Sequence, residues 1–162
     1  MTHVSRLALV AFVAAACAAP EAPPFTDADK AAIADSIEAA MHSYDAAIKA
    51  LDVGGVWAHY TASPDFRFIE NEAVYSLEEL RPVVEGLRSL RSYEGGFGEI
   101  HVNVLGREAA LADAPFIDVF TDSAGVVARV RGTVTWVWIR TPEGWRITHG
   151  QAYAVPDTTK GG

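Results

Sequence analysis

The chain has 162 residues, of which 50% are hydrophobic, and 13 Lys and Arg oppose 21 Asp and Glu for a formal net charge of −8. A chain of this size can bury a substantial core within one domain. The acidic balance, without any cluster of Lys and Arg, argues against nucleic acid and against anionic headgroups as partners of its surface. The only cysteine, Cys17, cannot form an internal disulfide, so the core must hold the domain together.

The first residues have the pattern of a secretory signal. Arg6 precedes an apolar run over residues 7–16, which is shorter than the roughly 20 apolar residues of a membrane-spanning helix and suits a signal-peptide core. The run ends at Cys17 in a sequence that resembles a lipobox, at which bacterial lipoproteins are cleaved and lipidated. This resemblance implies a signal peptide over residues 1–16, a lipid anchor on Cys17, and a domain that faces the periplasm from the bacterial envelope. Cleavage at a nearby small residue would instead release a soluble periplasmic or secreted protein.

The segment after this signal is predicted to be a tether. Residues 17–25 contain three prolines and no apolar periodicity, which is typical of a semi-extended linker. No repeat and no boundary of a second domain is visible. We therefore expect a single domain over residues 26–156, followed by a disordered tail over residues 157–162.

Two helices are predicted at the start of the domain. Thr26 and Asp29 form a capping box, after which apolar residues recur at three- and four-residue spacing as far as Leu51. This pattern indicates one long amphipathic helix. A short second helix is expected over residues 56–61.

A hairpin and a third helix follow. Residues 66–70 alternate in character and predict a strand, which turns back through residues 73–75. A second capping box, formed by Ser76 and Glu79, opens the third helix. Pro82 lies just past the first turn of this helix and is expected to bend it.

The remainder of the chain predicts β-structure. The Gly-rich residues 93–98 follow a helix and precede a strand, the reverse of a phosphate-binding loop, and we interpret them as a mobile rim. Strands are expected over residues 99–105, 108–121, 126–140 and 145–155. Helices first and long antiparallel strands last indicate an α+β fold, with a curved antiparallel sheet wrapped around about three N-terminal helices.

The last two strands carry several candidate pocket residues. Trp136 and Trp138 share one face of the first of these strands. On the next strand, the two-residue period places three polar residues on the same face as Trp145 and Ile147. These residues are His149, Gln151 and Tyr153. Polar groups on such a face must be satisfied within the core or must line a cavity.

The order of elements, closing in Gly-Trp-Arg-Ile-Thr-His-Gly at residues 144–150, resembles the nuclear transport factor 2-like superfamily and, within it, the SnoaL-like domains. The resemblance covers roughly residues 30–155. It implies a cone-shaped domain with one internal cavity that opens at one end. Members of this superfamily include ketosteroid isomerase, polyketide cyclases, dehydratases and proteins that only bind ligands, so the fold does not decide the function.

The resemblance to ketosteroid isomerase can be followed residue by residue. Tyr44 lies where that enzyme keeps the tyrosine of its oxyanion hole, which implies a hydroxyl that faces the pocket. The general-base aspartate of that enzyme corresponds to Phe68, and its second oxyanion donor corresponds to Trp136. Steroid isomerisation is therefore not expected, and Glu70 is the only nearby carboxylate that can substitute as a base.

Three residues are candidates for catalysis: His149, Asp113 and Tyr44. The imidazole of His149 can exchange a proton near physiological pH, although a histidine hydrogen-bonded within the core is the alternative. Gln151 stands where a second histidine often follows, which argues against a metal site. Asp113 interrupts an apolar strand face, where a carboxylate would be desolvated. A bulge at Pro115 would reverse the parity and send Asp113 to solvent.

The expected pocket has an aromatic wall, which suits a planar apolar ligand, although plain core packing is the alternative for these side chains. The predicted ligand-binding residues are Tyr44, Trp57, Tyr60, Phe66, Phe68, Glu70, Asp113, Trp136, Trp138, His149, Gln151 and Tyr153. No metal or cofactor is expected, because the five histidines show no ligand spacing.

Three functions remain open from the sequence. The leading hypothesis is an envelope-anchored domain that binds a small apolar or aromatic molecule in its cone. The alternatives are an isomerase, cyclase or dehydratase that uses acid–base chemistry on a carbonyl compound, and a non-catalytic dimerisation module. Polar side chains over residues 99–103 and 129–135 form the outer sheet face, and the resemblance implies a homodimer through that face.

Overall fold

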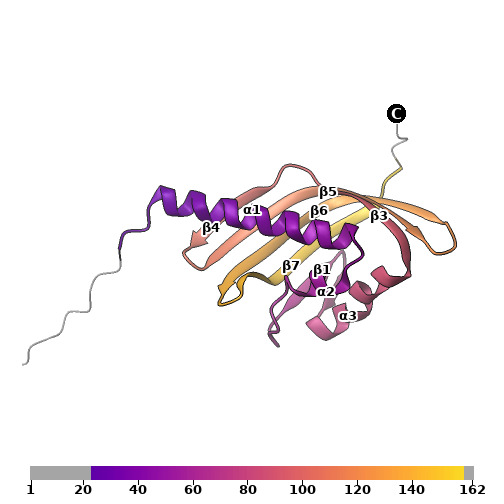
Figure 1. Ribbon diagram of the computed structural model, residues 1–162, viewed down its shortest axis with the longest axis horizontal. Helices are drawn as coiled ribbons and strands as arrows, with labels where there is room; N and C mark the ends of the chain where they lie inside the picture. The colour runs from indigo at the N-terminus through magenta and orange to yellow at the C-terminus, as the bar shows by residue number, and fades with distance from the viewer. Residues whose placement is uncertain (1–22, 159–162) are drawn as a thin grey trace, which may run out of the picture.

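The computed structural model describes residues 23–158 (Figure 1). The predicted signal peptide, Cys17, most of the predicted tether and the last residues of the predicted tail lie outside this range. Within residues 23–158, no helix is both long enough and apolar enough to span a membrane.

The elements follow the predicted order, with the long strands at the end of the chain (Figure 1). The helices are α1 (Asp27–Lys49), α2 (Val53–Trp57), α3 (Leu77–Glu85) and the 3-10 helix η1 (Gly86–Ser89). The strands are β1 (Arg67–Glu70), β2 (Ala73–Tyr75), β3 (Leu90–Phe97), β4 (His101–Gly106), β5 (Ala109–Asp122), β6 (Val127–Thr141) and β7 (Gly144–Pro156). The α+β fold class is confirmed.

Both predicted capping boxes are present. The hydroxyl of Thr26 accepts the backbone N–H of Asp29 at 3.2 Å, and the Asp29 carboxylate accepts the backbone N–H of Thr26 at 2.9 Å. Ser76 and Glu79 repeat this exchange at the start of α3. Each box satisfies donors that the first turn of a helix would otherwise leave unpaired. The helix α3 includes Pro82 and passes directly into η1.

The second helix begins earlier than predicted. The Asp52 carboxylate accepts the backbone N–H of Gly55 at 3.0 Å, so α2 starts at Val53 and ends before the predicted residues 56–61 are complete. Tyr60 lies beyond α2 and forms an isolated parallel bridge with Ile147 of β7. This bridge places the Tyr60 side chain against the core.

The seven strands form one sheet in the order β2-β1-β7-β6-β5-β3, and β4 also pairs with β5. The strands β3 and β4 share the same edge, because β4 pairs with residues 109–113 of β5 and β3 pairs with residues 116–122. The sheet is antiparallel except for the parallel pair β1 and β7. Residues 93–97 belong to β3 and pair with β5, so residues 93–98 form a paired strand and not a loop for nearly all of their length.

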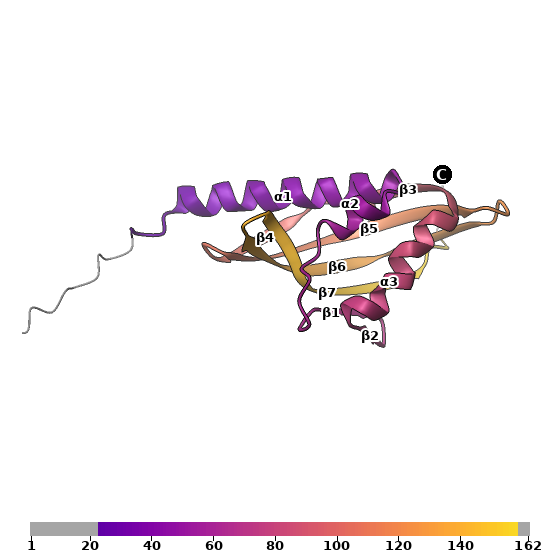
Figure 2. The ribbon, with the colours of Figure 1, turned by 60° about the horizontal axis from the view of Figure 1, so that its bottom comes forward.

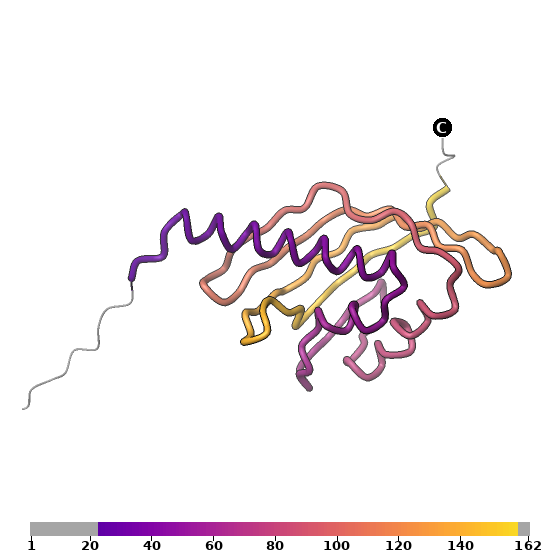
Figure 3. Tube along the Cα trace, viewed as in Figure 1, coloured from indigo at the N-terminus to yellow at the C-terminus, as the bar shows by residue number. Residues whose placement is uncertain are grey.

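The helices cover one face of the sheet. Figures 1 and 2 show α1 along this face, with α3 beside β1 and β2 at one end. The two ends of the described chain lie at opposite ends of the long axis (Figure 3). The most deeply buried large side chains come from both layers, namely Ile37 and Met41 of α1, Phe66, and Trp138 and Ile147 of the sheet.

A β-bulge in β7 decides which side chains face this core. Trp138 pairs with Ile147, whereas the adjacent Val137 pairs with His149, so Thr148 is the extra residue. The side chains of Trp145 and Ile147 are therefore buried, and after the bulge the inward set changes to small residues. These are Gly150, Ala152 and Ala154.

The bulge overturns one prediction from the sequence. Three residues were expected to continue the face of Trp145 and Ile147, but they lie opposite the outward Val137, Thr135 and Thr133 of β6. These residues are His149, Gln151 and Tyr153, and Tyr153 is 58% exposed. Their expected place on the pocket face is wrong, because one inserted residue exchanges the two faces of a strand.

The parity of β5 is also the reverse of the prediction. Asp113 pairs with His101 of β4 and with Thr135 of β6 on the outer face. The register between β5 and β6 is continuous through Pro115, so no bulge there is responsible. The inward residues of this part of β5 are instead three buried alanines, whose small side chains leave room for α1. They are Ala110, Ala112 and Ala114.

Candidate functional site: a cavity beneath the first helix

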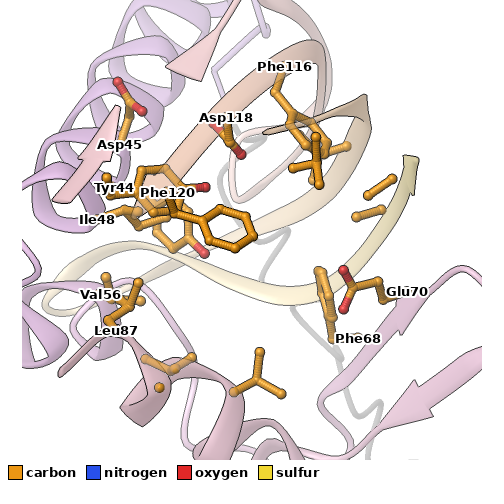
Figure 4. Close-up of a pocket in the computed structure, with 18 of the residues that line it drawn as sticks. Tyr44, Asp45, Ile48, Val56, Phe68, Glu70, Leu87, Phe116, Asp118 and Phe120 are labelled. Carbon is orange, nitrogen blue, oxygen red and sulfur yellow. The ribbon is translucent and has the colours of Figure 1, made fainter. Parts of the chain in front are cut away.

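A cavity of about 500 Å³ lies between the helices and the inner face of the sheet (Figure 4). This volume lies within the range of sites that hold small molecules. Its aromatic wall consists of Tyr44, Tyr60, Phe68, Tyr93, Phe97, Phe116, Phe120 and Trp136. Aliphatic side chains complete most of the remainder, among them Ile48, Val56, Leu80, Val84, Leu87, Leu90 and Val134. The charged residues at its surface are Asp45, Glu70 and Asp118.

The structure divides the predicted ligand-binding residues into three groups. Those that line the cavity are Tyr44, Tyr60, Phe68, Glu70 and Trp136. Those that pack in or against the core without lining the cavity are Trp57, Phe66 and Trp138. Those on the outer face are Asp113, His149, Gln151 and Tyr153. Of the three predicted catalytic residues, only Tyr44 therefore reaches the cavity.

Tyr44 and Tyr60 form a hydroxyl pair in the cavity wall. Their oxygens are 2.8 Å apart, and both side chains are buried. Burial is the main cause that raises the pKa of Tyr44 to about 12, and burial also raises the pKa of Tyr60 well above its usual value. Both groups are therefore neutral at physiological pH. Because only one hydroxyl donates within the pair, the proton of the other can be donated to a ligand.

Tyr93 and Asp118 form a second polar pair that the sequence reasoning did not identify. Asp118 lies on β5 opposite Gly95 of β3, and its carboxylate faces the cavity near Tyr44 (Figure 4). Burial raises the pKa of Asp118 and the nearby Asp45 carboxylate adds to this, while hydrogen bonding with the Tyr93 hydroxyl opposes it. Burial and the Asp118 charge together raise the pKa of Tyr93.

A signal for Asp118 was present in the sequence. Phe116, Asp118 and Phe120 follow the two-residue period of a strand, which places one carboxylate between two aromatic rings on the same face. The alternate residues of β5 include Leu111 and Ile117 and have a more apolar character, so the face that contains Asp113 was predicted to be the inner one.

Asp45 closes the cavity next to Asp118 but is already paired. Its carboxylate accepts a hydrogen bond from Lys49 Nζ at 2.6 Å across one turn of α1. Gly96 of β3 leaves room for this ion pair, because a Cβ at Gly96 would lie 2.8 Å from Asp45 Oδ1 and 2.8 Å from Lys49 Nζ. Gly96 also has a φ of 126°, which disfavours any other residue.

Two further polar groups border the cavity. Glu70 ends β1 beside Phe68, across the cavity from Tyr44 (Figure 4). Trp136 is 3% exposed, and its indole Nε1 has no hydrogen-bond partner within residues 23–158. In that same part of the chain, no group of three or more His, Cys, Asp and Glu could hold a metal ion.

Helices that pack on one face of a curved, unclosed sheet define the nuclear transport factor 2-like class of folds, and solved structures of this class are similar to this chain. A nuclear transport factor 2-like superfamily protein from Salmonella enterica subsp. enterica serovar Typhimurium str. LT2 is 18% identical with a TM-score of 0.69, covering 82% of this chain and 97% of that chain. A proposed scytalone dehydratase from Novosphingobium aromaticivorans DSM 12444 is 10% identical with a TM-score of 0.72, covering 80% and 89%. The hexachlorocyclohexane dehydrochlorinase LinA-type3 from Novosphingobium barchaimii LL02 is 10% identical with a TM-score of 0.64, covering 83% and 97%. At these identities the likeness shows the fold alone, and it confirms the fold that the sequence predicts.

The chain belongs to the AtzH-like family, which matches residues 26–156. The match runs from the N-cap residue Thr26 of α1 to the last residue of β7, Pro156. No curated protein sequence matches the chain.

Proposed function

We propose that the protein binds a small, largely apolar molecule in the cavity beneath α1. The observation that carries this proposal is the wall itself, which is aromatic and aliphatic apart from three carboxylates and a few tyrosine hydroxyls. Small-molecule sites combine a large apolar surface with a few polar groups that orient the ligand. The Tyr44–Tyr60 pair and the Tyr93–Asp118 pair are the orienting groups in this cavity.

The comparisons support a ligand-binding or enzymatic role for this fold. One structural neighbour is named as a dehydrochlorinase of hexachlorocyclohexane, which is a small apolar molecule, and another as a proposed scytalone dehydratase. These names describe the neighbours and not this chain, so they support only the size class of the ligand.

A cavity-filling variant tests the proposal. Leu87 lines the cavity, and Leu87→Trp should abolish binding of an environment-sensitive naphthalene fluorophore by occupying the space. Val127→Trp adds the same side chain at a position on β6 that is 62% exposed, and this control should bind as the unmodified protein does. Equal binding by both variants, with native circular dichroism, would place the fluorophore elsewhere and contradict the proposal.

A second candidate function is acid–base catalysis on a carbonyl compound, favoured by the position of Asp118 near Tyr44. In this proposal the Asp118 carboxylate removes a proton from the carbon next to the carbonyl. The electron pair of the broken C–H bond forms a carbon–carbon double bond, and the π electron pair of the carbonyl group moves to its oxygen. The Tyr44–Tyr60 pair donates a hydrogen bond to that oxygen. Exchange of this proton for deuterium in D₂O, followed by NMR, should disappear in Asp118→Asn if the step occurs.

We also propose that the chain is exported and anchored through Cys17. The apolar residues 7–16 before Cys17 support this proposal. The domain also contacts the end of the predicted tether. The Arg107 guanidinium donates to the carbonyl oxygens of Pro23 and Pro24, each at 2.8 Å. Mass measurement of the mature protein should find a lipidated Cys17 at the N-terminus. An unmodified N-terminus at another residue would contradict the anchor.

A homodimer through the outer sheet face is a further proposal. The exposed Tyr153 and Ile117 lie on that face among polar side chains, which is the mixed character of a reversible interface. Sedimentation velocity of the domain should show a concentration-dependent dimer that Tyr153→Asp weakens. A monomer at every concentration would contradict it.

A further inference from the structure

The charges around the cavity indicate which polar group its ligand carries. We propose that the ligand is a cation: an apolar or aromatic molecule with a protonated amine, whose ammonium group lies against Asp118 at the end of the cavity near Tyr93. This inference rests on the proposed function, because it names the class of ligand for the same cavity.

The charged residues that line the cavity are all acidic. Among the described residues that line the cavity, three are carboxylates and none is Lys, Arg or His. The Asp45 charge is neutralised by Lys49 at 2.6 Å. Asp118 and Glu70 form no ion pair with any Lys, Arg or His within residues 23–158. Asp118 and Glu70 therefore face the cavity without an ion-pair partner of their own, and the charge of Lys49, which is paired with Asp45, acts on Asp118 only from a distance.

Aromatic side chains lie on both sides of Asp118 in the cavity wall. The rings of Tyr93 and Phe120 stack with centroids 6.3 Å apart and an interplanar angle of 20°, and Phe116 precedes Asp118 on the same face of β5. Aromatic faces attract cations electrostatically, and more strongly where the site is shielded from water. A carboxylate flanked by such rings is a combination that binds ammonium groups.

Anionic and neutral ligands would fit this cavity less well than an ammonium compound. A carboxylate or phosphate ligand would enter a space that is partly shielded from water and whose lining carries carboxylates but no Lys, Arg or His, so its charge would be repelled. A neutral alcohol would fill the apolar part of the cavity but would gain only an ordinary hydrogen bond with Asp118, which is weaker than a charge-assisted one. The ammonium ligand uses both the rings and the carboxylate.

Three ligands of matched shape test the inference: 2-(1-naphthyl)ethylammonium, 2-(1-naphthyl)ethanol and 1-naphthylacetate. Titration calorimetry of the unmodified protein at pH 7 should give at least tenfold tighter binding of the ammonium compound than of the alcohol, and no binding of the carboxylate. In Asp118→Asn the preference for the ammonium compound over the alcohol should fall below threefold. The outer-face control Asp113→Asn should keep the preference, and Glu70→Gln tests whether the other unpaired carboxylate of the cavity carries it instead.

Each outcome decides between the proposals. If the alcohol binds as tightly as the ammonium compound, the cation inference is wrong and the proposed apolar ligand stands. If none of the three compounds nor the fluorophore binds, the proposed function fails and the inference fails with it. If Glu70→Gln removes the preference and Asp118→Asn keeps it, the assignment to Asp118 is wrong. The comparison of ligands on the unmodified protein remains decisive even if a variant does not fold.

Discussion

The hydroxyl oxygens of Tyr44 and Tyr60 are 2.8 Å apart although the two residues lie on α1 and on the loop that leads to β1. The Tyr44 ring also packs edge-on against Trp136 of β6, with centroids 4.7 Å apart. This single contact joins the helical layer to the sheet at the wall of the cavity. Tyr44 therefore both packs in the core and lines the cavity.

The pair predicts non-additive stability changes. Tyr44→Phe leaves the Tyr60 hydroxyl buried without its partner, which should cost about 1–3 kcal/mol of unfolding free energy, and Tyr60→Phe should cost a similar amount. The double variant removes both hydroxyls and should cost clearly less than the sum of the single changes. Urea unfolding of the four proteins at pH 7 measures the cycle. Additive losses would mean that the two hydroxyls do not interact.

Alkaline pH should destabilise the fold in a defined window. The pKa of Tyr44 is about 12 in the folded state and 10.0 when unperturbed, so the folded state holds this proton more tightly than the unfolded state does. The stability that this proton contributes is complete below about pH 10 and is lost as the pH rises toward 12. Urea midpoints between pH 9 and pH 12 should fall in that window, and Tyr44→Phe should show a shallower decrease. A parallel decrease in both proteins would contradict the assignment to Tyr44.

Asp118 should make the protein less stable at neutral pH than its amide variant. Its pKa is raised above 3.8 in the folded state, mainly by burial, so the folded state holds this proton more tightly than the unfolded state does. The stability that the proton contributes is complete below pH 3.8 and is lost as the pH rises through the folded-state pKa. Asp118→Asn removes the buried charge and should raise the Tm by roughly 2 °C or more at pH 7. The difference should shrink as the pH falls to 3.8. A constant difference at every pH would mean that the charge is not its cause.

Gly96 should not tolerate alanine. The new Cβ would lie 2.8 Å from both Asp45 Oδ1 and Lys49 Nζ, and the φ of 126° adds backbone strain. Gly96→Ala should lower the unfolding free energy by about 1–3 kcal/mol. Gly86→Ala is the matched control, because a Cβ at Gly86 would meet no atom within 4 Å. Equal stability of both variants would show that β3 can move away from α1 at no cost.

His149 should be dispensable for ligand binding. It pairs with the outward Val137 on β6 and does not line the cavity. His149→Ala should leave the affinity for 2-(1-naphthyl)ethylammonium within twofold of the unmodified protein, as measured by calorimetry. A large loss would mean that the outer face of β7 communicates with the cavity.

The sequence was most informative where its signals are local. The capping boxes that begin at Thr26 and Ser76 depend on side chains three residues apart, so both helix starts could be predicted without knowledge of the fold. The aromatic face of β6 could also be predicted, because Trp136 and Trp138 follow one uninterrupted period and both are buried.

The polar side chains of the site could not be predicted, because they depend on which alternate residues of β5 and β7 face the inside of the sheet. The bulge at Thr148 depends on the pairing of β7 with β6, and no residue type within β7 predicts it from the sequence. In β5 both faces are apolar, and the buried one carries alanines that a hydropathy pattern ranks below Leu111 and Ile117. The same inversion that moved Asp113 outward brought Asp118 to the cavity.

The bulge has a consequence for the size of the cavity. Beyond it, the floor of the cavity is built from Ala152 and Ala154, whereas Gly150 is fixed by Phe68 and Trp136, each 2.7 Å from the place of a Cβ. Adding a methyl group or two at either alanine would shorten the binding space without touching a hydrogen bond or the helical layer. The volume of the cavity can thus be changed from two positions of β7 without a change at Asp118, which lies on β5.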